Sequence, residues 1–125
     1  MKTKKLTPIP KLLKKVEKIF NAYIRERDQG LQCISCSNAG TQAGHYFPVR
    51  YSGVRYNEIN VNLQDSYCNC YAYGNQAMYR IGLVKKYGEQ AVKELEEEAV
   101  RTQYKKWTRT ELEELITTYK LPKVR

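Results

Sequence analysis

The sequence predicts a mixed α+β fold, in which a small zinc-stapled core carries flanking α-helices. Three observations lead to this prediction. Apolar residues recur at helical spacing at both ends of the chain. The middle, by contrast, breaks into short pieces separated by turn signals. Within that middle, two cysteine clusters bracket His45, the only histidine of the chain.

The N-terminal segment is basic and predicts an arm followed by a helix. Residues 1–10 are rich in lysine, contain two prolines and are expected to form a flexible arm. Residues 11–29 predict a basic amphipathic helix that ends at Gly30, because apolar side chains recur at helical spacing. The outer face of this helix carries Lys11, Lys14, Lys15 and Lys18.

Residues 30–88 are expected to form the zinc-stapled core. Residues 42–47 predict one strand, which stops at Pro48, and residues 54–57 predict a second after the Ser52-Gly53 turn. A two-stranded hairpin of this size is too small to be stable unaided. Its size is therefore a further argument for a bound metal.

Helix signals return after Asn75. Residues 76–87 predict a helix that Gly88 closes, and residues 89 to about 104 predict the next one. Thr108 and Glu111 have the spacing of a capping box, which would open a last helix. Residues 89–125 are therefore expected to form C-terminal helices.

The distribution of charge favours a polyanionic partner. The formal net charge is +9, and residues 1–28 hold nine Lys and Arg against three acidic residues. A basic arm beside an acid-poor middle suits nucleic acid. On charge alone, a solvated lysine-rich helix is the alternative. In the middle of the chain the positive charges are Arg50, Arg55 and Arg80, which join the helix lysines as predicted phosphate contacts.

No run of residues resembles an export signal or a membrane span, so we expect a cytoplasmic protein without a membrane partner. In a reducing cytoplasm, paired cysteines favour metal ligands over disulfides.

Cys33 and Cys36 have the spacing of a zinc knuckle. The second knuckle is irregular, because Cys68 and Cys70 are separated by one residue, whereas Asp65 and Cys68 have the regular spacing. Thiolate chemistry favours Cys70 as the fourth ligand and spacing favours Asp65, and the sequence leaves both open.

His45 is the candidate for acid–base chemistry, because neutral imidazole can take a proton from water near pH 7. Gly44, just before it, permits an unusual backbone or the close approach of a ligand. Downstream asparagines supply amide oxygens that can orient an imidazole or coordinate a hard cation. Phosphodiester hydrolysis needs an activated water, a cation and a basic surface, and the chain offers groups for each.

A family resemblance covers roughly residues 11–100. It is carried by Cys33-x₂-Cys36, the run Gln42-Ala43-Gly44-His45-Tyr46 and the run from Arg55 to Val61, and it continues through Cys68-Asn69-x₄-Gly74-Asn75. Together these segments resemble the NinG (Rap) recombination proteins of lambdoid phages. That resemblance implies a core like that of the HNH, or ββα-metal, nucleases, and an endonuclease for branched recombination intermediates of the Holliday-junction or D-loop type.

The resemblance also implies roles for individual residues. His45 would be the general base, Asn60 would hold the imidazole or its loop, and Asn69 would help to bind a catalytic Mg²⁺ or Mn²⁺, with Asn75 a weaker candidate. Structural zinc, branched or partly single-stranded DNA and phage recombination proteins are the implied cofactor and partners, in the cytoplasm of a bacterial host. A homodimer would suit a two-fold junction. Three tyrosines are candidates to stack on unpaired bases, with core packing as the alternative: Tyr46, Tyr51 and Tyr56.

The chain departs from the family pattern in its second half. Asn62 stands where the family usually has a histidine, Leu63 replaces a glycine and Asp65 replaces a cysteine. Gly44 occupies the position where many HNH enzymes carry an acidic metal ligand. These departures keep a second hypothesis open, namely a non-catalytic zinc module that binds DNA or a recombination protein.

Overall fold

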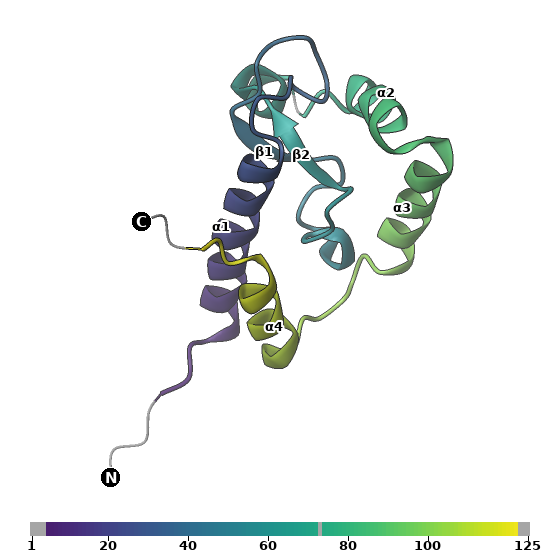
Figure 1. Cartoon of the computed structure of the whole chain (residues 1–125). Helices are drawn as coiled ribbons and strands as arrows, with labels where there is room; N and C mark the ends of the chain where they lie inside the picture. The colour runs from purple at the N-terminus through teal and green to yellow at the C-terminus, as the bar shows by residue number, and fades with distance from the viewer. Residues whose placement is uncertain (1–4, 73, 123–125) are drawn as a thin grey trace.

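The computed structural model describes residues 5–72 and 74–122. The first four residues of the expected arm and the last three of the expected C-terminal segment lie outside this range. The elements follow in the order α1 (Ile9–Arg27), β1 (Gln42–His45), the 3-10 turn η1 (Ser52–Val54), β2 (Val61–Gln64), the π-helical turn η2 (Tyr67–Tyr71), α2 (Gln76–Tyr87), α3 (Glu89–Arg101) and α4 (Arg109–Tyr119) (Figure 1).

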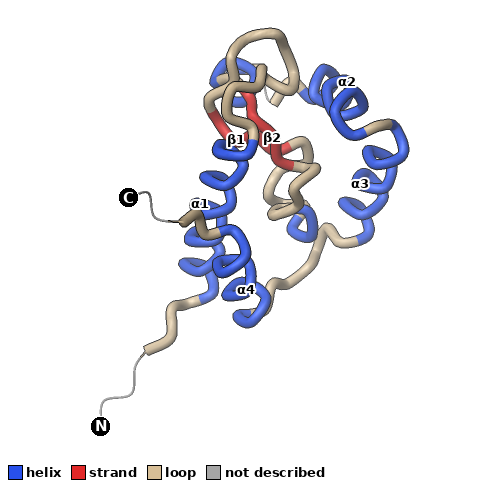
Figure 2. The backbone as a smooth tube through the Cα atoms, in the orientation of Figure 1, coloured by secondary structure: helices blue, strands red, loops and turns tan. Residues whose placement is uncertain are grey.

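The helices lie on two sides of a small antiparallel sheet. Helices α1 and α4 pack together on one side, and α2 and α3 pack together on the other (Figure 1). The two strands lie between these pairs (Figure 2). The mixed α+β prediction is therefore confirmed. In the part of the chain that the structure describes, no helix has the length and apolar character needed to cross a membrane.

Helix α1 forms because its apolar side chains repeat every four residues. Leu12, Val16, Phe20 and Ile24 are all buried, and they pack against Tyr56, Val61 and Leu112 of the sheet region and α4. The helix begins at Ile9, before the predicted start, because Pro10 fits the first turn, where its missing N–H costs no hydrogen bond. It ends at Arg27, two residues before the predicted end.

The prediction of the second strand was wrong. Residues 52–54 form a 3-10 turn, and the strand that pairs with β1 is Val61–Gln64, with His45 opposite Val61 and Gln42 opposite Gln64. All four residues of β2 are buried. The alternation of apolar and polar residues in Val61–Gln64 was a usable signal for a strand. It was misleading about exposure, because the polar side chains are buried and hydrogen-bonded.

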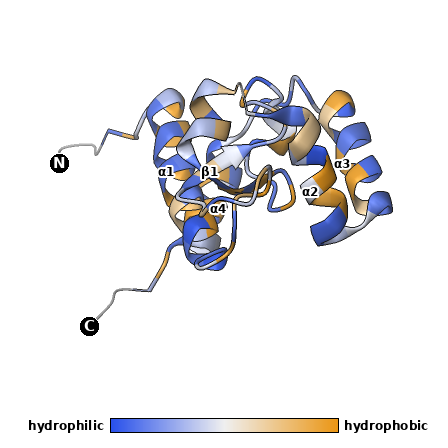
Figure 3. Cartoon of the chain, turned by 90° about the horizontal axis from the view of Figure 1, so that it is seen from above, coloured by the Kyte–Doolittle hydropathy of each residue, from blue (hydrophilic) through white to orange (hydrophobic). Residues whose placement is uncertain are grey.

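A second apolar core joins α2, α3 and the loop between the strands. Tyr79 and Leu83 of α2 pack with Val92 and Leu95 of α3 and with Val54 of η1. Helices α2 and α3 each carry both a hydrophobic and a hydrophilic face (Figure 3). Residues 76–87 form a helix that ends at Gly88, as predicted, and the capping box of Thr108 and Glu111 that opens α4 is confirmed.

A buried polar network ties α1, β2 and α2 together. Asp28, which is 2% exposed, accepts hydrogen bonds from the guanidinium of Arg27 at 2.9 Å and from Lys86 at 3.0 Å. The side-chain oxygen of Asn62 accepts from Arg27, Lys86 and Tyr87 at 2.9–3.0 Å. Although burial opposes ionisation, the bonds from Arg27 and Lys86 lower the pKa of Asp28. The network fixes the sheet between its helices.

Candidate functional site

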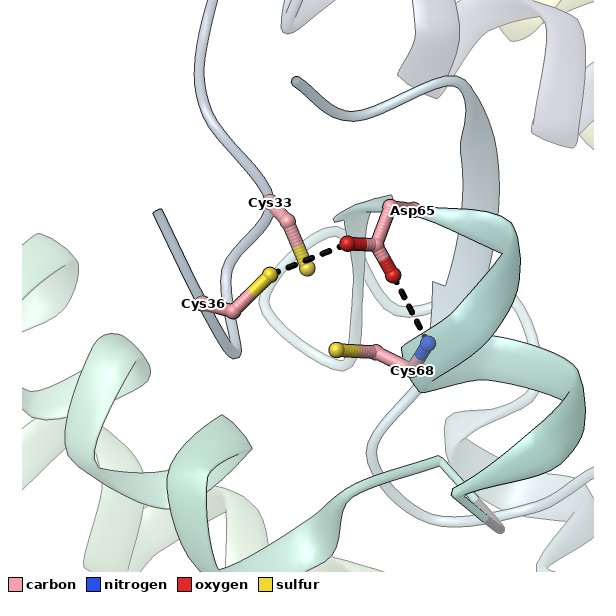
Figure 4. A group of neighbouring side chains, drawn as sticks. All are labelled: Cys33, Cys36, Asp65 and Cys68. Atoms are coloured by element: carbon pink, nitrogen blue, oxygen red, sulfur yellow. Dashed lines mark hydrogen bonds between the residues drawn. The ribbon is translucent and has the colours of Figure 1, made fainter. Parts of the chain in front are cut away.

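Four side chains from the two predicted knuckles converge beside the sheet. Cys33, Cys36, Asp65 and Cys68 bring their ligand atoms within 4.8 Å of one another (Figure 4). The loop after α1 supplies two of them, and the segment from the end of β2 into η2 supplies the other two. Three thiol sulfurs and one carboxylate oxygen form a donor set that suits tetrahedral zinc. The cluster is therefore compatible with a structural metal.

Hydrogen bonds hold the four donors in place. Asp65 accepts from the backbone N–H of Cys68 at 2.7 Å, and its other oxygen lies 3.0 Å from the Cys36 sulfur (Figure 4). Asn75 donates its side-chain N–H to the Cys68 sulfur at 3.6 Å. Such donors to sulfur and carboxylate orient metal ligands and support their charged forms.

Within the cluster, the Cys36 thiol and the Asp65 carboxylate shift each other's pKa through their hydrogen bond. The hydrogen bond to Asp65 raises the pKa of Cys36 to about 12, and the same bond from Cys36 lowers the pKa of Asp65 to about 2. The Cys36 thiol therefore keeps its proton and donates it to the Asp65 carboxylate. A dication at this position would displace the thiol protons and be bound by the resulting thiolates and the carboxylate.

The structure distinguishes between the two candidates for the fourth ligand, Asp65 and Cys70. Asp65 belongs to the cluster, whereas Cys70 is exposed and its sulfur lies 3.7 Å from the side-chain oxygen of Gln42. Cys70 sits two residues after Cys68 in η2, so its side chain leaves the turn in another direction. Among the described residues the donor set is thus three cysteines and one aspartate.

His45 lies at the end of β1 and is oriented by the backbone of a later loop. Its Nε2 is 3.0 Å from the carbonyl oxygen of Arg55. A carbonyl only accepts, so Nε2 must carry the proton, and Nδ1 is left as the acceptor of the neutral ring. Burial lowers the pKa of His45, and the bond to Arg55 opposes this shift without cancelling it. The imidazole is therefore held neutral, with a basic nitrogen available.

A cavity of about 290 Å³ joins His45 to the predicted metal-binding asparagine. Its lining consists of His45, Asn69, Pro48, Val49, Gly74 and Gln76. Asn69 reaches this cavity from η2, where its side-chain N–H donates to Gln42 at 2.9 Å. That bond directs the amide group and leaves its oxygen without a donor among the described residues. The structure thus brings together a neutral imidazole and an amide oxygen.

Gly44 packs closely against two side chains beside His45. A Cβ at this position would lie 1.9 Å from Oε1 of Gln64 and 3.1 Å from Oδ1 of Asn69. The Gly44 carbonyl in turn accepts a 2.7 Å hydrogen bond from the buried hydroxyl of Tyr79. The acidic residue that many HNH enzymes carry at this position would have to displace the side chain of Gln64.

Gln64 and Tyr79 were missed by the sequence analysis. Gln64 donates to Ser35 at 2.9 Å and to the carbonyl of Gly74 at 2.8 Å, while its buried oxygen has no hydrogen-bond partner among the described residues. Tyr79 ties α2 to the strand that carries His45. A polar residue at an alternate position of a buried strand, and an aromatic residue on the inner face of a helix, were the available signals.

Asn60 holds the loop between the strands and makes no hydrogen bond to the imidazole. Its side chain accepts from the N–H of Phe47 at 2.8 Å and donates to the carbonyls of Phe47 and Val54, both at 3.0 Å. Val54 directly precedes Arg55, whose carbonyl orients His45. Asn60 therefore acts on His45 through the loop. Asn75 occupies the N-cap position of α2 without a side-chain capping bond, donates its amide N–H to the Cys68 sulfur and is not part of the cavity lining.

The departure at Asn62 lies outside the His45 cavity. Its side chain belongs to the network with Arg27, Lys86 and Tyr87 and donates to the carbonyl of Ile59 at 2.7 Å. Asn62 does not line the cavity, so the asparagine at this position, where the family usually has a histidine, does not change which residues line it.

The predicted phosphate contacts divide into free and paired cations. The four α1 lysines are exposed and form no ion pair among the described residues, and the exposed Arg50 stacks over Tyr51 at 5.3 Å. Arg55 is paired with Glu17 at 3.0 Å, and Arg80 is paired with Glu89 and Glu96 at 3.2 and 2.9 Å. The lysines and Arg50 are thus the cations most accessible to a phosphate.

The tyrosines proposed for stacking contribute to packing. Tyr56 is 5% exposed and donates to the carbonyl of Leu13, and Tyr46 donates to Glu96 at 2.8 Å while packing on Tyr79. Tyr51 packs edge-on against Phe47. The interpretation as core or loop packing therefore fits these three side chains better.

Comparison with known proteins places the chain among phage proteins. The family profile described as "Bacteriophage Lambda NinG protein" matches residues 1–124. Protein ninG of Escherichia phage lambda is 35% identical over 125 residues, covering 95% of this chain and 60% of that protein. Protein ninG of Salmonella phage P22 is 34% identical with the same coverage, and that of Escherichia phage 933W is 37% identical over 102 residues.

The chain spans between half and three fifths of the length of these relatives, at 51% of the 933W protein and 60% of the lambda protein. No solved structure matches the chain.

Proposed function

The chain belongs to the NinG family of bacteriophage proteins, and on that premise we propose that it is a metal-dependent DNA endonuclease of the HNH, or ββα-metal, type. Its substrate would be a branched recombination intermediate. The observation that carries the proposal is the neutral His45 imidazole, fixed by the Arg55 carbonyl at the edge of a cavity shared with Asn69.

His45 would act as the general base. With Nε2 donating to Arg55, the lone pair on Nδ1 can accept a proton from water as that water attacks a phosphodiester. Tyr79 and Asn60 would keep the ring in position, because one fixes the strand at Gly44 and the other fixes the loop that ends at Arg55.

Amide oxygens are the donors available to a catalytic cation. Mg²⁺ or Mn²⁺ would neutralise the charge that develops at the scissile phosphate. Asn69 would contribute its side-chain oxygen, and the unpartnered oxygen of Gln64 lies behind it at Gly44. Both oxygens suit a hard cation but are uncharged, so the DNA phosphate must supply the negative charge that a carboxylate would otherwise provide.

The Cys33, Cys36, Asp65 and Cys68 cluster would hold a structural zinc. The cluster joins the loop after α1 to η2, so the metal would set the position of Asn69 one residue after Cys68. The exposed lysines of α1 and Arg50 would bind phosphates on the adjoining DNA arms.

The second candidate is a non-catalytic zinc module that binds DNA or a recombination protein. It is favoured by the lining of the His45 cavity, in which the described residues include no carboxylate, and by the glycine at position 44, where many HNH enzymes carry an acidic residue. This alternative predicts DNA binding without any cut that depends on His45.

The deciding experiment is cleavage of labelled four-way and D-loop DNA with Mg²⁺ or Mn²⁺, comparing the unmutated protein with His45→Ala. Loss of a general base should lower the rate about 100-fold or more. DNA affinity and zinc content, measured on both proteins, should stay the same. Binding without cleavage by the unmutated protein would establish the non-catalytic module instead.

A further inference from the structure

Two exposed tyrosines form a stacked pair on η2. Tyr67 and Tyr71 are 66% and 76% exposed, and their rings lie 6.3 Å apart at an angle of 29°. They occupy the first and last positions of the π-helical turn, whose carbonyl at Tyr67 accepts from the N–H of Ala72 at 2.9 Å. This regular turn presents both rings to solvent with nearly parallel faces.

The same turn carries groups of the proposed active site. Asn69, which lines the His45 cavity, lies two residues from each tyrosine, so its side chain leaves the turn on a different side from the two rings. Asp65 and Cys68 lie within two residues of Tyr67 and belong to the metal cluster, and Asp65 accepts from the Cys68 N–H at 2.7 Å. The rings are therefore attached to the segment that also carries the candidate metal and cavity residues.

The chemistry of this surface fits a nucleic-acid base. Aromatic faces stack on unpaired bases without regard to sequence, whereas the base faces within a duplex are already stacked on their neighbours. Residues 66–79 contain no acidic side chain, and the carboxylate just before them, Asp65, faces the cysteine cluster. Two rings are also far smaller than the roughly 800 Å² that each partner of a stable protein interface contributes.

We propose that Tyr67 and Tyr71 form a stacking platform for an unpaired base of the DNA substrate. The proposal rests on the function proposed above and adds to it a preference for DNA that contains unpaired bases. The platform would bind the base at the ring faces, while the lysines and Arg50 bind phosphates elsewhere.

The test measures binding without any added Mg²⁺ or Mn²⁺, so that it does not depend on cleavage. The zinc-loaded protein and the double variant Tyr67→Leu/Tyr71→Leu are titrated with a single-stranded oligonucleotide and with a blunt duplex, both fluorescently labelled. Loss of two stacking rings should weaken single-strand binding roughly 10-fold or more while leaving duplex binding unchanged. A 2-aminopurine in the single strand should be quenched by the unmutated protein and not by the variant.

Two matched variants complete the design. Tyr67→Phe/Tyr71→Phe keeps the rings and should retain single-strand binding. Tyr104→Leu removes another tyrosine, 86% exposed, and should also leave binding intact. Equal single-strand affinity of the double leucine variant and the unmutated protein would overturn the platform, as would equal losses for single strand and duplex. The absence of His45-dependent cleavage would overturn the proposed nuclease but not the platform.

Discussion

At the scale of single residues, the arrangement around His45 selects one form of the imidazole. The Arg55 carbonyl assigns the proton to Nε2, and burial disfavours a second proton on the ring. Gly44 and Asn60 act on this residue through the backbone, since one lets the strand approach Gln64 and the other fixes the loop. The protonation and position of His45 are therefore set by the surrounding backbone and loop.

The lowered pKa of His45 predicts how cleavage depends on pH. Because the neutral base persists below the ordinary value of 6.5, the rate should stay constant as pH falls to 6.5 and decline only in more acidic solution. Single-turnover rates across the acid and neutral range would check this. A half-maximal rate above pH 6.5 would contradict the burial of the ring.

The same shift predicts a change in stability. The unfolded chain binds a proton on His45 near pH 6.5, whereas the folded chain binds it only at lower pH. The contribution of the neutral ring to folding is therefore complete above pH 6.5 and is lost as pH falls through the folded value. Replacing His45 by Gln should remove this part of the pH dependence from thermal unfolding curves.

At the scale of elements, the turn η2 is the segment on which the candidate sites meet. It carries the candidate metal ligand Cys68, the cavity residue Asn69 and the two exposed rings within five residues. A two-stranded sheet cannot by itself fix such a turn. The candidate metal cluster adjoins the end of β2, and the buried network around Asp28 holds the strand at Asn62 and Leu63.

The donor set predicts that Asp65 and Cys70 differ in their effect on the metal. Asp65→Ala should reduce zinc content and lower the melting temperature, because one of four ligands is lost. Cys70→Ser, the matched change outside the cluster, should leave both unchanged. Asp65→Cys, which restores the ligand usual in the family, should retain zinc. Metal analysis together with thermal unfolding would check these outcomes, and zinc loss from Cys70→Ser would argue for Cys70 as the ligand.

At the scale of the whole molecule, α1 and α3 differ in charge and lie on opposite sides, while α4, which packs on α1, adds the exposed Glu113 and Glu114. The basic helix α1 lies at one side, whereas α3 with its run of glutamates, Glu96–Glu98, lies at the other (Figure 1). Glu96 and Glu89 also neutralise Arg80. A polyanion should therefore approach over α1 and avoid the α3 side.

This division predicts which lysines contribute to DNA binding. Lys14→Gln/Lys18→Gln should reduce the dependence of affinity on salt by about two phosphate contacts, close to two units of log–log slope. Lys93→Gln on α3 should leave the slope unchanged, because that lysine lies among glutamates. Titrations of duplex DNA at several salt concentrations would check this, and equal slopes for all three proteins would exclude α1 as the phosphate-binding face.

The features that the sequence determined by itself are local. The helical period placed α1, α2 and α3 to within a few residues, Gly88 marked the end of α2, and the capping box of Thr108 and Glu111 marked the start of α4. Such signals depend on hydrogen bonds and side-chain contacts between residues three or four apart, so a short window contains them. The spacing of Cys33 and Cys36 was readable for the same reason.

Tertiary structure alone decided the pairings between distant segments. It placed the second strand at Val61–Gln64, brought Asp65 and not Cys70 to the cysteines, and put the Arg55 carbonyl on His45. Each outcome depends on contacts between segments far apart in the sequence, and a buried polar strand becomes stable only when distant donors such as Arg27 and Lys86 reach it. Spacing favoured Asp65 over Cys70, but only the fold brought this aspartate to Cys33 and Cys36, which lie about thirty residues earlier in the chain.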